Sequence, residues 1–175
     1  MQFSATKLEG AWLIEPQPHK DSRGLFARTY CAREFREQGL VDHFVQCNTS
    51  WNAHKGTVRG LHYQLPPSTE VKLVRCTAGA LLDVIVDLRP GSPTYLQYVA
   101  VELTARNRFA LYIPGMFAHG FQTLEESTEV FYQMSEFYAL KLSRGLRYND
   151  SRLGVKWPLP VASISDQDLS WALLQ

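Results

Sequence analysis

The chain has 175 residues, a length that suits one domain with a substantial core, and 45% of them are apolar, which argues against disorder. Its 18 basic and 17 acidic side chains leave a formal charge of +1, without the basic surplus typical of proteins that bind nucleic acid. No apolar run approaches the ~20 residues needed to cross a bilayer. The N-terminal stretch MQFSATKLEGAW lacks the apolar core of a signal peptide, so we expect a cytoplasmic protein with no membrane partner.

Short β runs rich in Val, Leu, Tyr and Phe dominate the chain. In chain order the predicted strands cover 11–16, 24–30, 44–52, 57–64, 71–79, 80–89, 95–104, 108–114, 119–125, 129–138 and 145–150. Turn-forming residues such as those at 21–24 and 89–93 separate them. One helix is predicted over residues 31–38, closed by Gly39, and a second short helix after Ser165.

Many short strands at this spacing predict an all-β sandwich, jelly roll or barrel, here as a single domain over residues 1–175. Aromatic and polar residues interleave within single strands, as in HYQ (62–64) and YQM (132–134). A fully packed sandwich would alternate more cleanly. The pattern therefore favours a barrel that is open at one mouth, where ligand sites are common.

Three cysteines, Cys31, Cys47 and Cys76, are odd in number and widely spaced. This spacing makes a disulfide framework improbable, and no C-x-x-C pair indicates a zinc site. We expect reduced thiols with packing roles.

Three stretches carry side chains that could do chemistry. They are RGLHYQLPPSTEVKLVRC with Arg59, His62 and Lys72, IPGMFAHGFQTLE with His119, and EVFYQMSEFY with Tyr132 and Tyr138. Carboxylates are available at Asp83, Asp87, Asp166 and Asp168.

A metal site is not expected around His62. The positions two residues away on either side are Gly60 and Gln64, so the H-x-H pattern common in metal-binding barrels is missing. Isolated histidines without a nearby His/Glu pair make a poor transition-metal site.

Acid–base chemistry fits these residue types better. A histidine can take a proton near neutral pH, and a carboxylate bonded to its other nitrogen would fix the tautomer. A lysine can stabilise an oxyanion, and a tyrosine across the cavity can return a proton. Together they could invert a carbon next to a carbonyl, although composition alone favours His62 as a hydrogen-bonded core residue.

The sequence also resembles a known family, the dTDP-4-dehydrorhamnose 3,5-epimerases, or RmlC-like sugar-nucleotide epimerases. The resemblance runs from about residue 21 to residue 168. It is carried by DSRGLF, QCNTSW, GTVRGLHYQLPP, KLVRC, DVIVDLRPGSPTY, IPGMFAHGF, FYQMSEFY, RYNDSRLGVKWP and ISDQD.

The resemblance implies a cupin-type jelly roll with a few short helices, and a homodimer that exchanges N-terminal strands. It implies no metal or redox cofactor. The implied substrate is a nucleotide-diphosphate sugar, a 4-keto-6-deoxyhexose, inverted at C3, C5 or both.

Carried over by position, the resemblance implies a catalytic role for four residues. His62 matches the base, Asp168 its acidic partner with Asp166 as the fallback, Lys72 the stabiliser of the C4 oxygen, and Tyr132 the opposed acid. Substrate-binding roles are implied for Arg59, which would bind the diphosphate, for Arg23 from the other subunit, and for Phe26, which would pack near the nucleotide base. Further substrate-lining positions are Gln46, Asn48, His119 and Tyr138. Asp83 could pair with His119 or Lys72, or serve as a buried structural carboxylate.

Several positions depart from the family pattern. Arg28 and Ser143 replace glutamates, Glu70 replaces a glutamine two residues before the lysine, and Gly-Met-Phe follows Ile113-Pro114 where Glu-Gly-Phe is usual. Because Arg28 lies near the nucleotide-binding region, its charge reversal bears on recognition of the base rather than on catalysis. Three alternatives stay open: a related 3-epimerase or 3,4-ketoisomerase, a sugar-nucleotide-binding module without turnover, and a metal-dependent cupin dioxygenase.

Overall fold

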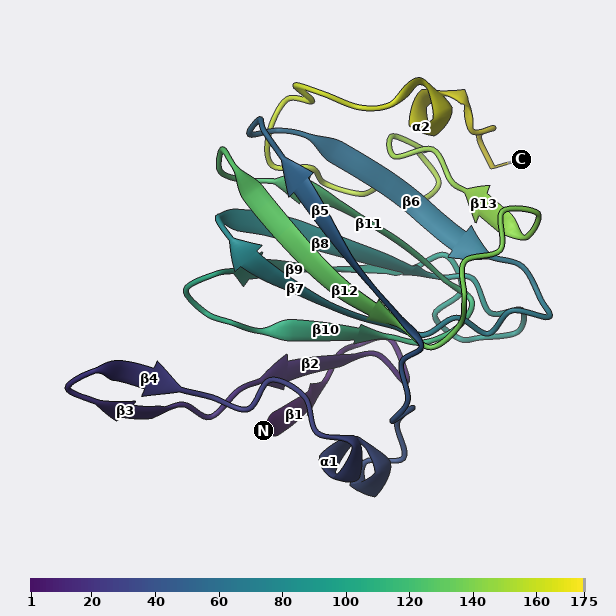
Figure 1. Ribbon diagram of the computed structural model, residues 1–175. Helices are drawn as coiled ribbons and strands as arrows, with labels where there is room; N and C mark the ends of the chain where they lie inside the picture. The colour runs from purple at the N-terminus through teal and green to yellow at the C-terminus, as the bar shows by residue number, and fades with distance from the viewer. Residues whose placement is uncertain (175) are drawn as a thin grey trace.

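Two facing β-sheets form the body of the protein in the computed structural model, which describes residues 1–174 (Figure 1). The six-stranded sheet has the order β1 (Gln2–Ala5), β2 (Trp12–Glu15), β10 (Ala110–Ile113), β7 (Lys72–Ala78), β12 (Thr128–Met134) and β5 (Gln46–Asn52). The five-stranded sheet has the order β13 (Ser143–Gly145), β6 (Val58–Gln64), β11 (Phe117–Thr123), β8 (Ala80–Asp87) and β9 (Tyr98–Thr104). A separate hairpin joins β3 (His19–Asp21) to β4 (Gly24–Phe26), and the two short helices are α1 (Ala32–Glu37) and α2 (Asp166–Ser170).

From β5 onwards the chain passes back and forth between the two sheets, except at the β8–β9 hairpin, where both strands belong to the same sheet. Neighbouring strands in both sheets pair antiparallel. This is the jelly-roll arrangement, so the predicted all-β fold class is confirmed.

The core has three layers because both sheets are covered on their outer faces. Ile85, Leu111 and Val130 lie in the cluster between the sheets. Residues of the C-terminal segment, including Leu153, pack on the outer face of the five-stranded sheet. Phe35 of α1 packs on the outer face of the six-stranded sheet.

Strand β8 explains why the sequence alternates so imperfectly. Its residues Leu81 and Ile85 face the inner cluster, while Val84 and Val86 face the C-terminal segment. A strand that is buried on both faces has no solvent-facing positions, so its sequence reads as a nearly continuous apolar run.

The structure corrects several predicted elements. The predicted strand over 145–150 is wrong beyond its first residue: β13 covers Ser143–Gly145, and the chain turns at Asp150, whose carboxylate accepts the Arg152 N–H. The predicted strand over 24–30 ends at Phe26. Strands β1 and β3 were not predicted, because each is short and its pairing depends on a chain reversal rather than on a local pattern.

Both predicted helices are present. α1 is followed by Gln38 as its C-cap and by Gly39, whose φ of +69° is the left-handed conformation that favours glycine. α2 begins after Ser165, whose hydroxyl accepts the Asp168 N–H. Within residues 1–174, no helix is both long and apolar enough to span a membrane, and the cytoplasmic location stays a prediction.

All three cysteines are free thiols, as expected. Cys76 is buried in the inner core cluster and fits the expected packing role. Cys47 is exposed, so the packing role does not hold for it, because alternate residues of β5 point outward.

Asp87 organises the turn that follows β8. Its fully buried carboxylate accepts hydrogen bonds from the Arg89 backbone and guanidinium and from the hydroxyls of Ser92 and Thr94. Burial raises the pKa of Asp87, but these donors outweigh burial and hold the pKa well below its usual value.

We predict that Asp87→Asn lowers the free energy of unfolding by about 2–3 kcal/mol at pH 7, because the amide lacks the negative charge and places an NH₂ donor where one carboxylate oxygen accepts. A depressed folded-state pKa stabilises the fold above the unfolded pKa, near 3.8, and this contribution is lost as pH falls further. The difference in the free energy of unfolding between Asp87→Asn and the parent protein, measured by urea titration, should therefore be smaller at pH 3 than at pH 7. Exposed Glu102 provides the control variant, Glu102→Gln. Equal stability of the Asp87 variant and its parent at pH 7 would contradict the assignment.

Candidate functional site

A cavity of about 530 Å³ lies at one mouth of the jelly roll and is lined from both sheets. The five-stranded sheet contributes Arg59 and His62 from β6 and His119 from β11, the six-stranded sheet contributes Ser50, Lys72 and Tyr132, and α2 contributes Asp168. A smaller cavity of about 190 Å³ adjoins it and shares His62, Lys72 and Tyr132. These shared side chains therefore stand at the junction of the two cavities.

His62 and Asp168 form the closest polar pair of the site. The Nε2 atom of His62 lies 2.5 Å from Oδ1 of Asp168, although the two residues are 106 positions apart. Asp168 is 4% exposed, and its Oδ2 accepts the Gly60 N–H at 3.2 Å. The Nδ1 atom of His62 has no hydrogen-bond partner within residues 1–174, so it is the nitrogen free to exchange a proton with a ligand.

The Asp168 carboxylate is held in its ionised form. Burial raises the pKa of Asp168, but the hydrogen bond and positive charge of His62, together with hydrogen bonds from Gly60 and Ser165, outweigh burial and lower the pKa. A permanent carboxylate fixes the ring orientation and stabilises the imidazolium that forms when His62 takes a proton.

Lys72 and Tyr132 face the same space. The ammonium of Lys72 forms an ion pair with Glu70, with Nζ and Oε2 2.9 Å apart. Burial raises the pKa of the Tyr132 phenol, and Glu70 acts in the same direction, whereas Asn48 and Arg59 lower it. The phenol is therefore protonated at neutral pH and can act as an acid.

Arg59 is held from behind by Asn52. The Arg59 Nε donates to the Asn52 amide oxygen at 2.7 Å, and the Asn52 amide nitrogen donates to the carbonyls of Ser50 and Thr128. This leaves the terminal guanidinium nitrogens of Arg59 for a ligand in the cavity, where a planar fork suits phosphate oxygens.

A second histidine–carboxylate pair lies deeper in the site. The Nε2 atom of His119 is 2.7 Å from Oδ1 of Asp83, and Asp83 is fully buried. Of the two partners considered for Asp83, the structure selects His119, while Lys72 pairs with Glu70.

Two glycines let β6 and β11 approach closely where the histidines stand. A side chain at Gly60 would meet the Gly120 Cα at 2.6 Å, and Gly60 has a φ of +110°. The pairing register also shifts between His119 and Phe121. This irregularity sets His62 and His119 opposite each other at the cavity.

The predicted substrate-lining residues of β5 and of the loop after β12 have different positions. Asn48 and Tyr138 line the smaller cavity. Gln46 lies beside it and accepts the Tyr138 N–H while donating to Asn48. Gln46 therefore anchors the loop after β12 and lines neither of these two cavities.

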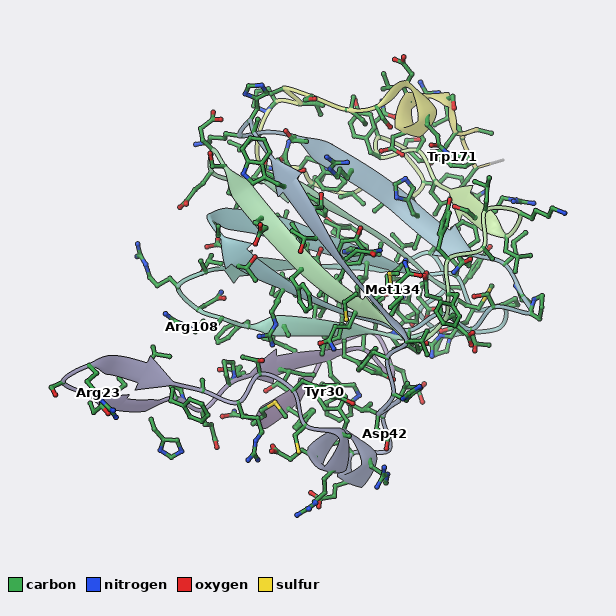
Figure 2. The ribbon with its side chains drawn as sticks, in the orientation of Figure 1. Arg23, Tyr30, Asp42, Arg108, Met134 and Trp171 are labelled. Atoms are coloured by element: carbon green, nitrogen blue, oxygen red, sulfur yellow. The ribbon has the colours of Figure 1, made fainter. Side chains whose placement is uncertain are left out.

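Arg23 and Phe26 line neither of these two cavities in their own chain. Both belong to the β3–β4 hairpin, which projects from the body of the molecule, and Figure 2 shows Arg23 near its tip. The Arg23 side chain is 88% exposed and bonded only to Asp21, and Phe26 is 75% exposed. Nearby Arg28 forms an ion pair with Glu34.

Sequence analysis missed several polar residues that line the cavities or support them. They are Ser50, Asn52, Thr57, Gln64, Ser163 and Gln167. A period-two count along β5 would have found Ser50 and Asn52, because they share a face with Gln46 and Asn48. The residues of the C-terminal segment carry no comparable local signal.

The arrangement can abstract a proton at one side of a ligand and deliver one from another side. His62 supplies the base, Lys72 a compact positive charge for an oxyanion, and Tyr132 an acid. In the part of the chain that the structure describes, no three His, Cys, Asp or Glu side chains cluster in a way that could hold a metal ion.

Comparison with known proteins identifies relatives over nearly the whole chain. The sequence model of a family described as dTDP-4-dehydrorhamnose 3,5-epimerase matches residues 5–175. An enzyme of that name from Sinorhizobium fredii is 42% identical over 171 residues, which cover 97% of this chain and 88% of the relative.

Solved structures agree in fold. A dTDP-4-dehydrorhamnose 3,5-epimerase from Bacillus anthracis with TDP and PPi bound superposes with a TM-score of 0.96 at 39% identity, covering 99% of each chain. A dTDP-6-deoxy-D-glucose-3,5-epimerase from Legionella pneumophila in complex with dTDP-4-keto-L-rhamnose gives a TM-score of 0.92 at 37% identity, covering 98% of this chain and 92% of its own.

We predict that Gly145→Ala separates His62 from Asp168. A side chain at Gly145, which pairs with His62 across β13 and β6, would meet the Trp171 ring at 2.2 Å (Trp171 is labelled in Figure 2). Trp171 is the C-cap of α2, so a displaced ring carries Asp168 with it. A crystal structure of the variant should show the Nε2–Oδ1 distance lengthened beyond hydrogen-bonding range.

The double variant Gly145→Ala with Trp171→Ala removes the obstructing ring and serves as the control. It should restore the His62–Asp168 contact. An unchanged His62–Asp168 distance in Gly145→Ala alone would show that the site does not depend on the packing of Trp171 against Gly145.

Proposed function

Because the chain belongs to the dTDP-4-dehydrorhamnose 3,5-epimerase family, we propose that it epimerises a dTDP-linked 4-keto-6-deoxyhexose at C3 and C5. The observation that carries the proposal is the shared cavity in which the His62–Asp168 pair, Lys72 and Tyr132 converge. Hydrogens on carbons next to a ketone are acidic, and side chains alone can move them. The proposed chemistry therefore matches what the cavity offers.

In the proposed reaction His62 removes the proton from the carbon beside the C4 ketone, and Asp168 stabilises the resulting imidazolium. The electron pair moves onto the C4 oxygen, where Lys72 stabilises the enolate. A preorganised donor of this kind is worth roughly 3–4 kcal/mol of barrier lowering. Tyr132 then returns a proton to the opposite face of the carbon, which inverts it.

We place the diphosphate at the other end of the larger cavity, near Arg59. The terminal guanidinium nitrogens of Arg59 are left for a ligand by the Asn52 contact. The relative with TDP and PPi bound shows that a protein of this family holds such groups.

We also propose a homodimer in which the β3–β4 hairpin of one protomer reaches the site of its partner. No residue of the hairpin lines either of the two cavities around His62 in its own chain, and the hairpin exposes Leu25 and Phe26 as well as Arg23. Exposed apolar side chains on a projecting two-stranded element favour burial against a second copy.

We predict that the protein incorporates solvent deuterium at C3 and C5 of dTDP-4-keto-6-deoxyglucose. NMR in D₂O reports each carbon separately, so exchange at C3 alone would point to a 3-epimerase instead. His62→Asn should slow exchange at both carbons by about 10²–10⁴-fold, because a placed general base contributes this much. His54→Asn, at an exposed histidine that lines neither cavity, is the matched control and should exchange normally. Absence of exchange in the parent protein would refute the proposed reaction.

We predict that mixing two impaired variants restores activity if the hairpin is exchanged. Arg23→Ala should raise KM because the partner's site loses a phosphate contact, and His62→Asn should lower kcat. A hybrid dimer contains one site with both native residues, so activity at low substrate should exceed the sum of the separate variants. Elution as a monomer, or no gain on mixing, would argue against the shared site.

A further inference from the structure

We propose that Glu70 is a positioning residue of the reaction, because it holds the Lys72 ammonium at the junction of the two cavities. The inference rests on the proposed function and adds to it the residue through which Lys72 is oriented. Sequence analysis treated Glu70 only as a departure from the family pattern.

The geometry of the pair points to this role. Glu70 lies two residues before Lys72 at the start of β7, and the ion pair joins Lys72 Nζ to Glu70 Oε2 at 2.9 Å. The Lys72 side chain is only 12% exposed and the Glu70 side chain 6%. Glu70 lines only the smaller cavity, whereas Lys72 lines both cavities. The carboxylate therefore contacts the ammonium from the side of the smaller cavity.

A lysine depends more than an arginine on an ion-pair partner to fix the position of its charge. Its side chain has four rotatable carbons and a compact charge, so an unheld ammonium samples many positions. It also carries three N–H donors, and one of them can bond Glu70 while another bonds the substrate oxygen. The ion pair therefore restricts Lys72 without consuming its capacity to stabilise an enolate.

Lys72 is also the partner that Glu70 requires. Within residues 1–174, Lys72 is the sole ion-pair or hydrogen-bond partner of the Glu70 side chain. A buried carboxylate without a counter-charge is strongly unfavourable, so the pair persists unless both members change.

Glu70 has a second effect through charge, on Tyr132. Its negative charge favours the protonated phenol, and so adds to the effect of burial on the Tyr132 pKa. The other charged or titratable groups that line these two cavities with the phenol are Arg59, His62, Tyr63, Lys72, His119, Tyr138 and Asp168. None of these is removed by a substitution at Glu70, so a change in pH dependence can be traced to the carboxylate.

The first test measures the pair itself, without turnover. In ¹⁵N-labelled protein, a buried and bonded lysine ammonium exchanges its protons slowly enough to give an NMR signal. Glu70→Gln and Glu70→Ala should lose or shift the Lys72 signal. Glu136→Gln changes a nearby glutamate that contacts Thr69 and lines neither cavity, and it should leave the signal unchanged. A Lys72 signal that is identical in all variants would overturn the proposal.

The second test measures the consequence for the reaction. Glu70→Ala should lower kcat for deuterium exchange about 10- to 100-fold with less than a threefold change in KM, because orientation matters in the transition state. Glu70→Gln should retain more activity, since its amide oxygen can still accept from Lys72. It should also lose activity at a lower pH on the alkaline side, because Tyr132 deprotonates more readily without the neighbouring charge.

A double-mutant cycle separates positioning from a general structural role. If Glu70 acts through Lys72, Glu70→Gln should cause no further loss of kcat in a Lys72→Met background at neutral pH, where Tyr132 is protonated with or without the Glu70 charge. Additive losses would overturn the proposal. No exchange by the parent protein would instead refute the proposed function, and the NMR signal would still decide whether Glu70 holds Lys72.

Discussion

The site depends on one partly buried contact, the hydrogen bond between His62 and Asp168. It joins a strand of the five-stranded sheet to a short C-terminal helix across 106 residues of sequence. The carboxylate is shielded from water, yet its other oxygen is bonded to Gly60 and its helix is capped by Ser165. Each of these contacts favours the ionised form, and an ionised partner is what makes the imidazole a competent base.

The rest of the site follows the same principle, because each cationic or basic group has a partner fixed behind it. Asn52 holds Arg59, Glu70 holds Lys72, and Asp83 holds His119. Groups that are already oriented need no reorganisation when charge develops on a substrate. The jelly roll makes this possible because its two sheets converge on one mouth, and alternate residues of each strand point into it.

Much of the fold was readable from the chain itself. The apolar runs and turn residues predicted most strands and both helices, and Gly39 and Ser165 act as the helix-end residues expected of them. The errors lie where pairing rather than pattern decides the structure, as in β1 and β3 or after Gly145. Short strands such as β1 and β3 contain too few residues to show a two-residue period. The segment after Gly145 has the composition of a strand, but it forms turns instead of pairing with a neighbouring strand.

For the site, the sequence by itself determined the inventory of chemical groups: a histidine and a lysine on strands that are consecutive in the chain, a tyrosine, and candidate carboxylates. It left Asp166 and Asp168 both open as the partner of His62, as well as the partner of Asp83 and the role of Glu70. Only the tertiary structure decided these, because a histidine–carboxylate bond forms between segments whose distance is set by packing. The N-cap at Ser165 and the packing of the Trp171 ring against Gly145 fix the rotation of α2. In this rotation Asp168 is buried and Asp166 is exposed.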